Sequence, residues 1–258
     1  MAVALDASTP AFSGTIPGAN YSAKFTSGPG TETSASFTPP DASLVAFLVM
    51  STTGQVFASL GLTAADSAST SYTLSPASQV SSSGIGSAAI FTHYYASSPG
   101  AVTVTATLAA GETAGSGTSL DIAVLVFTGA ASSQAGAGSA GLIMPSSSVN
   151  QEISLTTTTA GSWVVICAAN FTGGSGFSSP DANTLTYGNG ADSGGAGTAF
   201  GYSAAATVTP GATTFGWTQA GADKATLAAL EILPAAAPAS SKRHPGSPVP
   251  VLAAAMRM

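Results

Sequence analysis

Apolar residues along this chain gather into three continuous runs, separated by stretches rich in Gly, Ser, Thr and Pro. The runs cover residues 44–50, 120–127 and 163–169, and the first and third contain no polar residue on either face. A strand that is apolar on both faces is covered on both sides. Residues 44–50 and 163–169 are therefore predicted to be central strands of a β-structure.

Gly-containing turns between β-favouring segments predict hairpins. One such turn, at residues 160–162, follows a Thr-rich segment, and Pro-Gly pairs occur at 99–100 and 210–211. The three expected hairpins join residues 153–159 with 163–169, residues 88–95 with 102–108, and residues 200–203 with 213–218. Residues 102–108 alternate strictly between apolar and polar, which is typical of a strand with one wet face.

The last apolar segment, residues 226–233, is rich in Ala and Leu, which also favour a short helix. We favour a strand, because the preceding hairpin needs a neighbour and Pro234 follows without a helix cap. The total is roughly ten strands at short spacing with turn signals between them, and no repeat of fixed period is visible. We expect an all-β protein, in which residues 1–234 form one domain, a jelly-roll-like antiparallel β-sandwich.

The composition changes after Pro234. Residues 235–258 contain repeated prolines, which favour an extended chain without internal hydrogen bonds. Such a segment has no core of its own, so we expect an extended, Pro-rich C-terminal arm that docks on a partner. The residues expected to make the docking contacts are basic or apolar, namely Lys242, Arg243, His244, Val249, Val251 and Leu252.

Charged side chains are scarce. They make up 6% of the residues, against roughly a quarter in an average domain, whereas 45% of residues are apolar. Before the arm, only Lys24 and Lys224 oppose all 11 acidic residues. Such an acidic body argues against nucleic acid and anionic membrane as partners, because phosphate binding needs clustered Lys or Arg. No apolar stretch approaches the roughly 20 residues of a membrane-spanning helix, and the N-terminus lacks the pattern of a secretory signal.

Catalytic and metal-binding residue types form no cluster in the sequence. Cys167 is the only cysteine and lies in an apolar run, which predicts a structural role. His93 has no carboxylate or second histidine nearby, and the carboxylates are scattered singly. We therefore expect no enzymatic activity, no cofactor and no metal. The segments around Asp181 and Asp192 have the oxygen-rich composition of calcium loops, but turn-forming Asx residues are the favoured explanation.

Four aromatic residues outside the apolar runs have two interpretations. Flat rings pack on the C–H faces of sugars, so Tyr94, Tyr95, Tyr202 and Trp217 are candidates for a glycan-stacking face. Aromatic residues more often fill a core or brace neighbouring strands, and this second interpretation is favoured.

Four segments of the sequence, taken in chain order, are similar to segments of a known protein module. They are residues 37–46 (FTPPDASLVA), 124–130 (VLVFTGA), 160–165 (AGSWVV) and 225–234 (ATLAALEILP). Together they resemble a β-sandwich module of virion proteins, especially minor tail proteins, of tailed phages that infect actinobacteria. The resemblance extends from about residue 35 to residue 234 and rests mostly on strand-core residues, which specify a fold better than an activity.

This resemblance implies a structural or adhesive role on the phage particle, as a minor tail protein or a capsid decoration protein. The implied partners are other capsid or tail proteins, a homo-oligomer is possible, and no catalytic residue is supplied. The expected location is the virion, after synthesis in the host cytoplasm and release by lysis. The alternative function is a lectin-like carbohydrate-binding module that recognises host cell-wall glycan.

Overall fold

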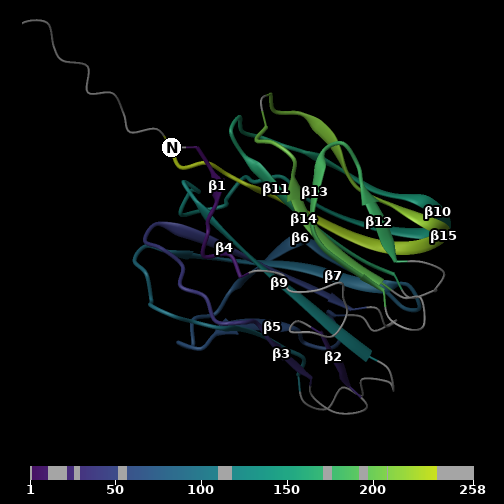
Figure 1. Cartoon of the computed structure of the whole chain (residues 1–258), viewed down its shortest axis with the longest axis horizontal. Helices are drawn as coiled ribbons and strands as arrows, with labels where there is room; N and C mark the ends of the chain where they lie inside the picture. Colours follow the sequence, from purple (N-terminus) through teal and green to yellow (C-terminus); the bar gives the residue numbers. More distant parts are fainter. Residues whose placement is uncertain are drawn as a thin grey trace, which may run out of the picture.

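The computed structural model of the protein describes residues 2–10, 22–25, 30–51, 57–109, 118–170, 176–191, 197–207 and 209–236. These residues form fifteen strands and no helix, and the paired strands are antiparallel. The expected all-β, antiparallel class is confirmed. Figure 1 shows two halves stacked on each other, one purple to blue-green and one green to yellow.

The first half contains nine strands in two sheets. The larger sheet has the order β1-β9-β4-β7-β6, with β2 also paired to β9, and the smaller has the order β3-β8-β5. The strands are β1 (Ala4–Leu5), β2 (Ser22–Phe25), β3 (Thr31–Thr33), β4 (Ser43–Ser51), β5 (Thr63–Asp66), β6 (Thr73–Ser82), β7 (Gly86–Tyr95), β8 (Val104–Thr107) and β9 (Thr118–Thr128). As predicted, β4 is a central strand that is buried on both faces.

The second half contains six strands in one sheet of order β10-β15-β11-β14-β13, with β12 also paired to β15. The strands are β10 (Ser139–Thr156), β11 (Trp163–Asn170), β12 (Phe177–Pro180), β13 (Thr184–Ala191), β14 (Gly197–Ser203) and β15 (Ala212–Ile232). The predictions for residues 163–169 and 226–233 are confirmed, since the first lies in the central strand β11 and the second forms most of the end of β15.

The ribbon formed by β10 and β15 is folded back on itself. Residues 139–144 pair with residues 225–230, residues 150–156 pair with residues 212–218, and register shifts separate the two stretches. The two ends of β10 come together, because a Cβ atom on Gly138 would lie 2.2 Å from the carbonyl oxygen of Thr156. The fold-back makes the second half a sandwich of its own, with a core that contains Trp217.

The two halves have the same strand order. The first part of β10, the last part of β15, β11, β14 and β13 stand in the order of β1, β9, β4, β7 and β6. The last part of β10, the first part of β15 and β12 likewise stand in the order of β3, β8 and β5. The described residues thus contain two copies of one sandwich topology, which the sequence did not reveal as a repeat.

The same turn begins both central strands and fixes how the two halves are aligned. The Ser43 hydroxyl donates to the carbonyl oxygen of Pro40 at 2.6 Å, and the Ser162 hydroxyl donates to that of Thr159 at 2.7 Å. The residue before each serine has a positive φ, 53° at Ala42 and 81° at Gly161. With the serines aligned, the next residues also correspond: Leu44 pairs with Phe127, and Trp163 pairs with Ile232.

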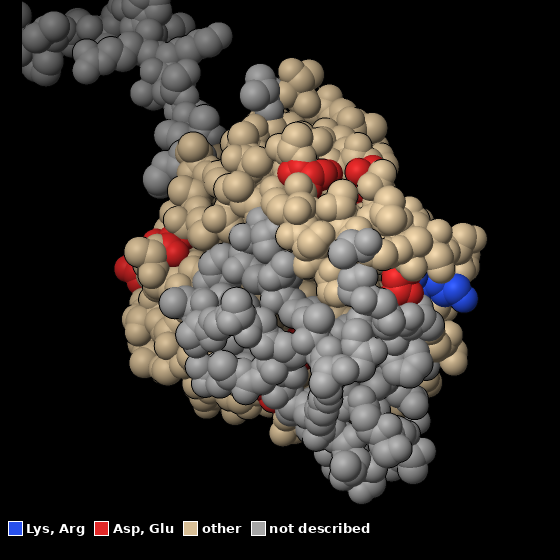
Figure 2. Space-filling model, turned by 45° about the vertical axis from the view of Figure 1, so that its right-hand side comes forward, with Lys and Arg blue, Asp and Glu red and all other residues tan. Residues whose placement is uncertain are grey.

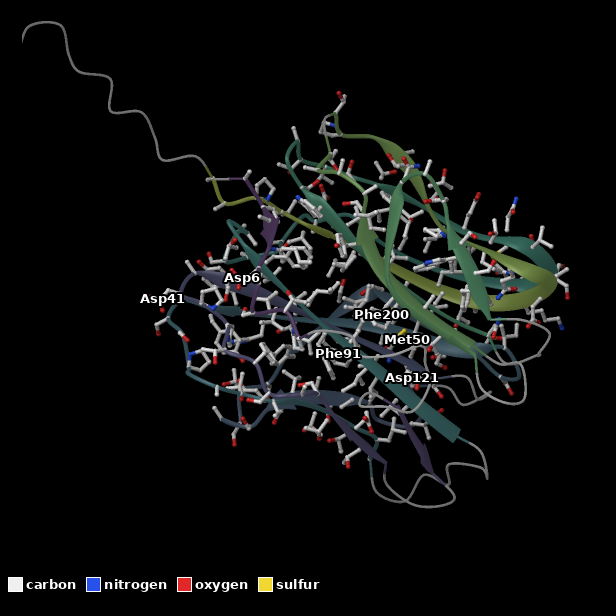
Figure 3. The ribbon with its side chains drawn as sticks, viewed as in Figure 1. Asp6, Asp41, Met50, Phe91, Asp121 and Phe200 are labelled. Carbon is white, nitrogen blue, oxygen red and sulfur yellow. The ribbon has the colours of Figure 1, made fainter. Side chains whose placement is uncertain are left out.

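The halves pack face to face and share a buried core. The contact is made by the sheet β1-β9-β4-β7-β6 of the first half and by β11, β14 and the paired ends of β10 and β15 in the second half. Met50 from β4 and Phe200 from β14 both belong to this shared core, and Figure 3 shows them near the boundary between the halves. The approach is close: a Cβ atom on Gly86 would lie 3.0 Å from the carbonyl oxygen of Ala169. The Thr198 hydroxyl also donates to Asp121 Oδ2 at 2.7 Å across the boundary. The stack is therefore one continuous body, in which both halves depend on the shared core.

All three hairpin predictions are wrong for the same reason. The strands on either side of each turn belong to different layers: β10 pairs with β15 rather than β11, β7 pairs with β4 and β6 rather than β8, and β14 pairs with β11 and β13 rather than β15. Each turn carries the chain from one sheet of a sandwich to the opposite sheet.

Candidate functional site

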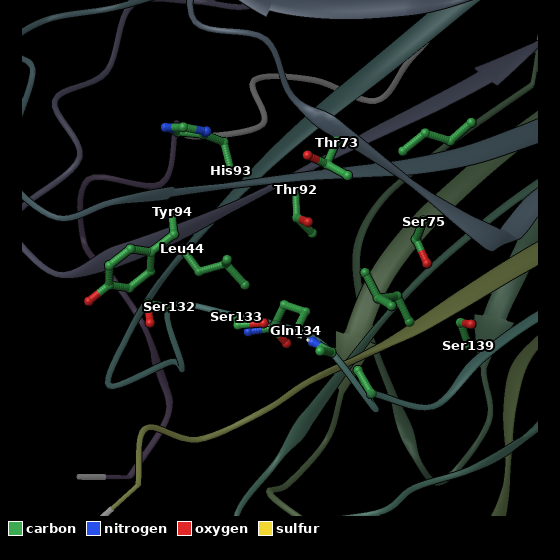
Figure 4. A pocket seen from close by; sticks show the side chains of 14 residues that line it. Leu44, Thr73, Ser75, Thr92, His93, Tyr94, Ser132, Ser133, Gln134 and Ser139 are labelled. Atoms are coloured by element: carbon green, nitrogen blue, oxygen red, sulfur yellow. Dashed lines mark hydrogen bonds between the residues drawn. The ribbon is translucent and has the colours of Figure 1, made fainter.

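A groove of about 570 Å³ lies where the two halves meet, and its size is within the range of small-molecule sites. Its walls come from β6 and β7 of the first half and from residues 129–138, the connecting segment between the halves. Strands β4, β10 and β15 add one residue each. The lining residues include Leu44, Thr73, Leu74, Ser75, Thr92, His93, Tyr94, Ser132, Ser133, Gln134, Ser139 and Leu230, most of them visible in Figure 4.

The alternation of β7 decides which of its side chains face the groove. Thr92 and Tyr94 point toward the connecting segment, whereas His93 points to the opposite side of the strand (Figure 4). Leu44 and Leu230, both almost fully buried, form an apolar floor. Tyr94 is half-buried and packs against the shared core, so that its ring forms one wall of the groove.

The wall formed by the connecting segment is held in place by one side chain. The Gln134 amide donates to the carbonyl oxygen of Ala131 at 3.0 Å and accepts from the Leu233 amide at 2.8 Å. A turn follows, in which the Ala137 amide donates to the carbonyl oxygen of Gln134 at 3.1 Å. Because these bonds tie the segment to the end of β15, the groove is preformed.

The groove presents hydroxyl groups around its apolar floor. The side chains of Thr73, Thr92, Tyr94, Ser132 and Ser139 make no hydrogen bond to any other described residue, so their oxygens are open to a ligand. Hydroxyl groups both donate and accept hydrogen bonds. This lining suits a ligand that carries neutral hydroxyl groups.

A buried polar network lies on the other side of β7. The Tyr95 hydroxyl donates to Asp66 Oδ2 and lies 3.0 Å from the Tyr72 hydroxyl, and the His93 ring packs on both tyrosines, with centroids 4.5 Å from Tyr95 and 5.4 Å from Tyr72. Asp66 Oδ1 also accepts the amides of Ala68 and Thr70. Asp66 and Tyr72 could not be singled out from the sequence, because strand pairing, and not a motif, brings them together.

Burial and hydrogen bonding set the protonation of this network. Burial raises the pKa of Asp66, but hydrogen bonds from Tyr95, Thr70 and Ala68 outweigh it, so the pKa lies below its ordinary value. Burial and the bond to Asp66 raise the pKa of Tyr95. Burial lowers the pKa of His93, and Asp66 opposes this shift only in part. Burial and the bond to Tyr95 also raise the pKa of Tyr72. Near pH 7 these shifts favour a neutral histidine and two protonated tyrosines around one carboxylate, an arrangement that braces the fold.

Two carboxylates, Glu32 and Asp121, lie near each other away from the groove. Burial, and then the nearby charge of Asp121, raise the pKa of Glu32 to about 7.

Cys167 is fully buried and its pKa is raised by that burial, in agreement with its expected structural role.

The four aromatic candidates for a glycan-stacking face do not come together. Trp217 is only 1% exposed and Tyr95 only 5%, so neither offers a ring face to solvent; both fit the favoured interpretation, in which aromatic residues fill the core. Tyr202 is half-buried and stacks on Trp163 with centroids 5.6 Å apart. Tyr94 alone lines the groove.

The expected docking residues Lys242, Arg243, His244, Val249, Val251 and Leu252 lie outside the described residues. Of the two calcium candidates, Asp192 also lies outside them. Asp181 accepts the Asn183 amide at 3.0 Å, which is a turn-forming Asx contact. The described residues contain no group of three or more acidic, histidine or cysteine side chains that could hold a metal ion. They also include no helix long and apolar enough to cross a membrane.

Comparison with known proteins gives no relative: no family model matches the chain, and no curated protein or solved structure is significantly similar to it.

Proposed function

We propose that this chain is a non-enzymatic structural virion protein of a tailed bacteriophage, displayed on the particle as a minor tail or capsid decoration protein. The observation that carries the proposal is the way in which the chain leaves the fold. The Ala235 amide donates to the carbonyl oxygen of Gly129 at 2.8 Å, and the next residue, Ala236, is exposed. The Pro-rich arm therefore starts at the surface of a folded body, beside β1 (Figure 1).

An arm that starts at the surface suits attachment to a neighbouring virion protein. An extended segment can add to the edge of a partner's sheet, where main-chain hydrogen bonds give affinity and side chains such as Val249, Val251 and Leu252 give specificity. Lys242 and Arg243 add positive charge to a chain whose body is acidic. In Figure 2 the described part of the face shows acidic groups at separate places, one of them beside a basic side chain.

Mass spectrometry of purified particles, with heads and tails separated, tests this proposal. We expect the chain in one of the two fractions, and we expect deletion of residues 237–258 to abolish its incorporation while the body still folds. Replacing Val249, Val251 and Leu252 by serine should have the same effect, whereas replacing Ser240 and Ser241 by alanine should not. Absence from both fractions, or normal incorporation of the deletion variant, would overturn the proposal.

Carbohydrate binding is a second candidate function, favoured by the groove between the halves. The groove combines an apolar floor, an aromatic wall and a rim of hydroxyl groups, which is the chemistry that sugar recognition uses. The two functions are compatible, because a displayed virion protein can also bind the host surface.

A further inference from the structure

The two halves provide an internal comparison for the groove, because the same strand positions carry different side chains. Ala46 pairs with Thr92 in the first half, and the corresponding Val165 pairs with Tyr202 in the second. Leu44 likewise corresponds to Trp163. At two of the positions that line the groove, the second half therefore has much larger aromatic side chains.

In the second half these aromatic side chains fill the corresponding space. The rings of Trp163 and Tyr202 are stacked with centroids 5.6 Å apart, and Trp163 also packs 6.3 Å from Phe127 of the first half. All three belong to or pack on the shared core. The same backbone arrangement is thus closed by aromatic packing on one side and open as a groove on the other.

The open side is also the side with ligand-binding groups. Thr92 and Tyr94 present hydroxyl groups there that bond to no other described residue, and Gln134 fixes the opposite wall by bonds to Ala131 and Leu233. A preformed pocket with a rigid aromatic wall loses little entropy on binding. A sugar ring has an apolar C–H face that can pack on the ring of Tyr94. Its equatorial hydroxyl groups can form hydrogen bonds with the hydroxyl groups around the groove.

We propose that the groove between the halves is a binding site for a neutral pyranose or furanose unit, with Tyr94 as the stacking residue and the Thr92 hydroxyl as a hydrogen-bonding group. This assignment rests on the carbohydrate-binding candidate function and gives it a site. It also replaces the dispersed aromatic face with a single location that both halves build.

A second pocket offers a matched control. About 350 Å³ is open in the second half, lined by Asn183, Ser203, Ala205, Thr207 and Phe215 among others. Ala205 follows Tyr202 at the distance at which Tyr95 follows Thr92, so Ala205 corresponds to Tyr95. Both Thr92→Tyr and Ala205→Tyr therefore introduce a tyrosine that the other half carries at the same position, but they fill different pockets.

Calorimetric titration of the full chain tests the assignment. The probes are arabinose, galactose, glucose, mannose and N-acetylglucosamine, free and as disaccharides, at millimolar concentration. We expect at least one to bind, with affinity lowered roughly tenfold or more by Thr92→Tyr and by Tyr94→Ala. Ala205→Tyr should leave the affinity within about twofold of wild type. Thermal unfolding of each variant confirms that it is folded.

Three results would overturn the assignment. Binding that survives Thr92→Tyr but is lost in Ala205→Tyr would place the sugar in the second pocket. Equal loss in both variants would indicate a general effect of the added tyrosine. No binding of any probe by the wild-type chain would remove the sugar site, and if that chain is still found in particles, the structural virion role stands without it.

Discussion

Glu231 is the residue whose replacement we expect to destabilise the second half most clearly. Its side chain lies inside the protein, and its carboxylate accepts hydrogen bonds from two separate segments, at Gly138 and at residues 158–159. Oε2 accepts the Gly138 amide at 2.8 Å and the Thr158 hydroxyl at 2.9 Å, while Oε1 accepts the amides of Thr158 at 2.9 Å and Thr159 at 3.1 Å. The carboxylate thus ties the start of β10 and the turn before β11 to β15, where the fold-back closes.

The variant Glu231→Gln keeps the size of the side chain but removes one acceptor. Because Gly138 and Thr159 donate to different oxygens, the amide NH₂ of glutamine must face one of these two donors and leave it without an acceptor. A hydrogen bond to a charged group contributes about 1.5–3 kcal/mol, and a buried donor left unpaired costs about 1–3 kcal/mol. We expect Glu231→Gln to lower the free energy of unfolding by about 2–4 kcal/mol near pH 7.

The pH dependence of this loss follows from the pKa of Glu231. Burial raises that pKa, but hydrogen bonds, first from Gly138 and then from Ser162 and Thr158, hold it below the ordinary value of 4.5. A carboxylate with a depressed pKa stabilises the fold fully above its unfolded pKa and loses this contribution as pH falls through the folded pKa. The difference between wild type and Glu231→Gln should therefore shrink as the pH is lowered below 4.5 and through the folded pKa.

Guanidinium unfolding followed by tryptophan fluorescence measures the effect, because both tryptophans, Trp163 and Trp217, lie in the second half. Glu152→Gln is the matched control: this half-buried residue of β10 makes no side-chain hydrogen bond to another described residue, and we expect a change within about 0.5 kcal/mol. A Glu231→Gln variant as stable as this control, or one whose deficit does not shrink in acid, would refute the reasoning.

Three further predictions concern the first half and the turns. Tyr95→Phe removes the hydroxyl that donates to Asp66 and should cost about 1.5–3 kcal/mol in urea unfolding at neutral pH, with less effect once Asp66 is protonated in acid; an unchanged midpoint would contradict it. Ala42→Gly should stabilise the fold by up to about 1 kcal/mol and Gly161→Ala should destabilise it by about 1 kcal/mol, because both positions have a positive φ. Thermal melting measures both changes, and a lower melting temperature for Ala42→Gly or an unchanged one for Gly161→Ala would contradict this. Because the folded pKa of Glu32 is raised to about 7, its charge destabilises the fold progressively as pH rises from about 4.5 through 7, so Glu32→Gln should raise stability at about pH 8 and not at about pH 4; a gain independent of pH would refute this.

The segments that are apolar on both faces were the part of the fold that the sequence predicted well. Residues 44–50 and 163–169 are central strands because only a strand covered on both faces tolerates an apolar side chain at every position. The turns were predicted less well. The turn at residues 160–162 was located correctly, but a Gly-containing turn shows that the chain reverses and not whether the next strand lies in the same sheet or the opposite one.

The groove could not be predicted for a related reason. Thr92 and Tyr94 face Gln134 only because the two sandwiches stack through their larger sheets, and this contact joins residues about 40 positions apart in sequence that match no motif. Tyr94 was singled out as an aromatic residue, but it was grouped with Trp217, whose ring the fold-back of β10 and β15 buries.

The comparison of the halves separates what the shared fold requires from what one half has added. Positions common to both, such as the hydroxyls of Ser43 and Ser162 at the two turns, serve the fold. The positions that differ alter side-chain volume or polarity without moving the strands, as when Thr92 is replaced by Tyr202 or Val126 by Glu231. A ligand in the groove would contact both halves at once and would stabilise the folded stack by an amount that rises with the logarithm of its concentration relative to Kd. Ligand binding should therefore raise the unfolding temperature of the wild-type chain and leave that of Thr92→Tyr unchanged, which links the proposed site to the stacking of the two sandwiches.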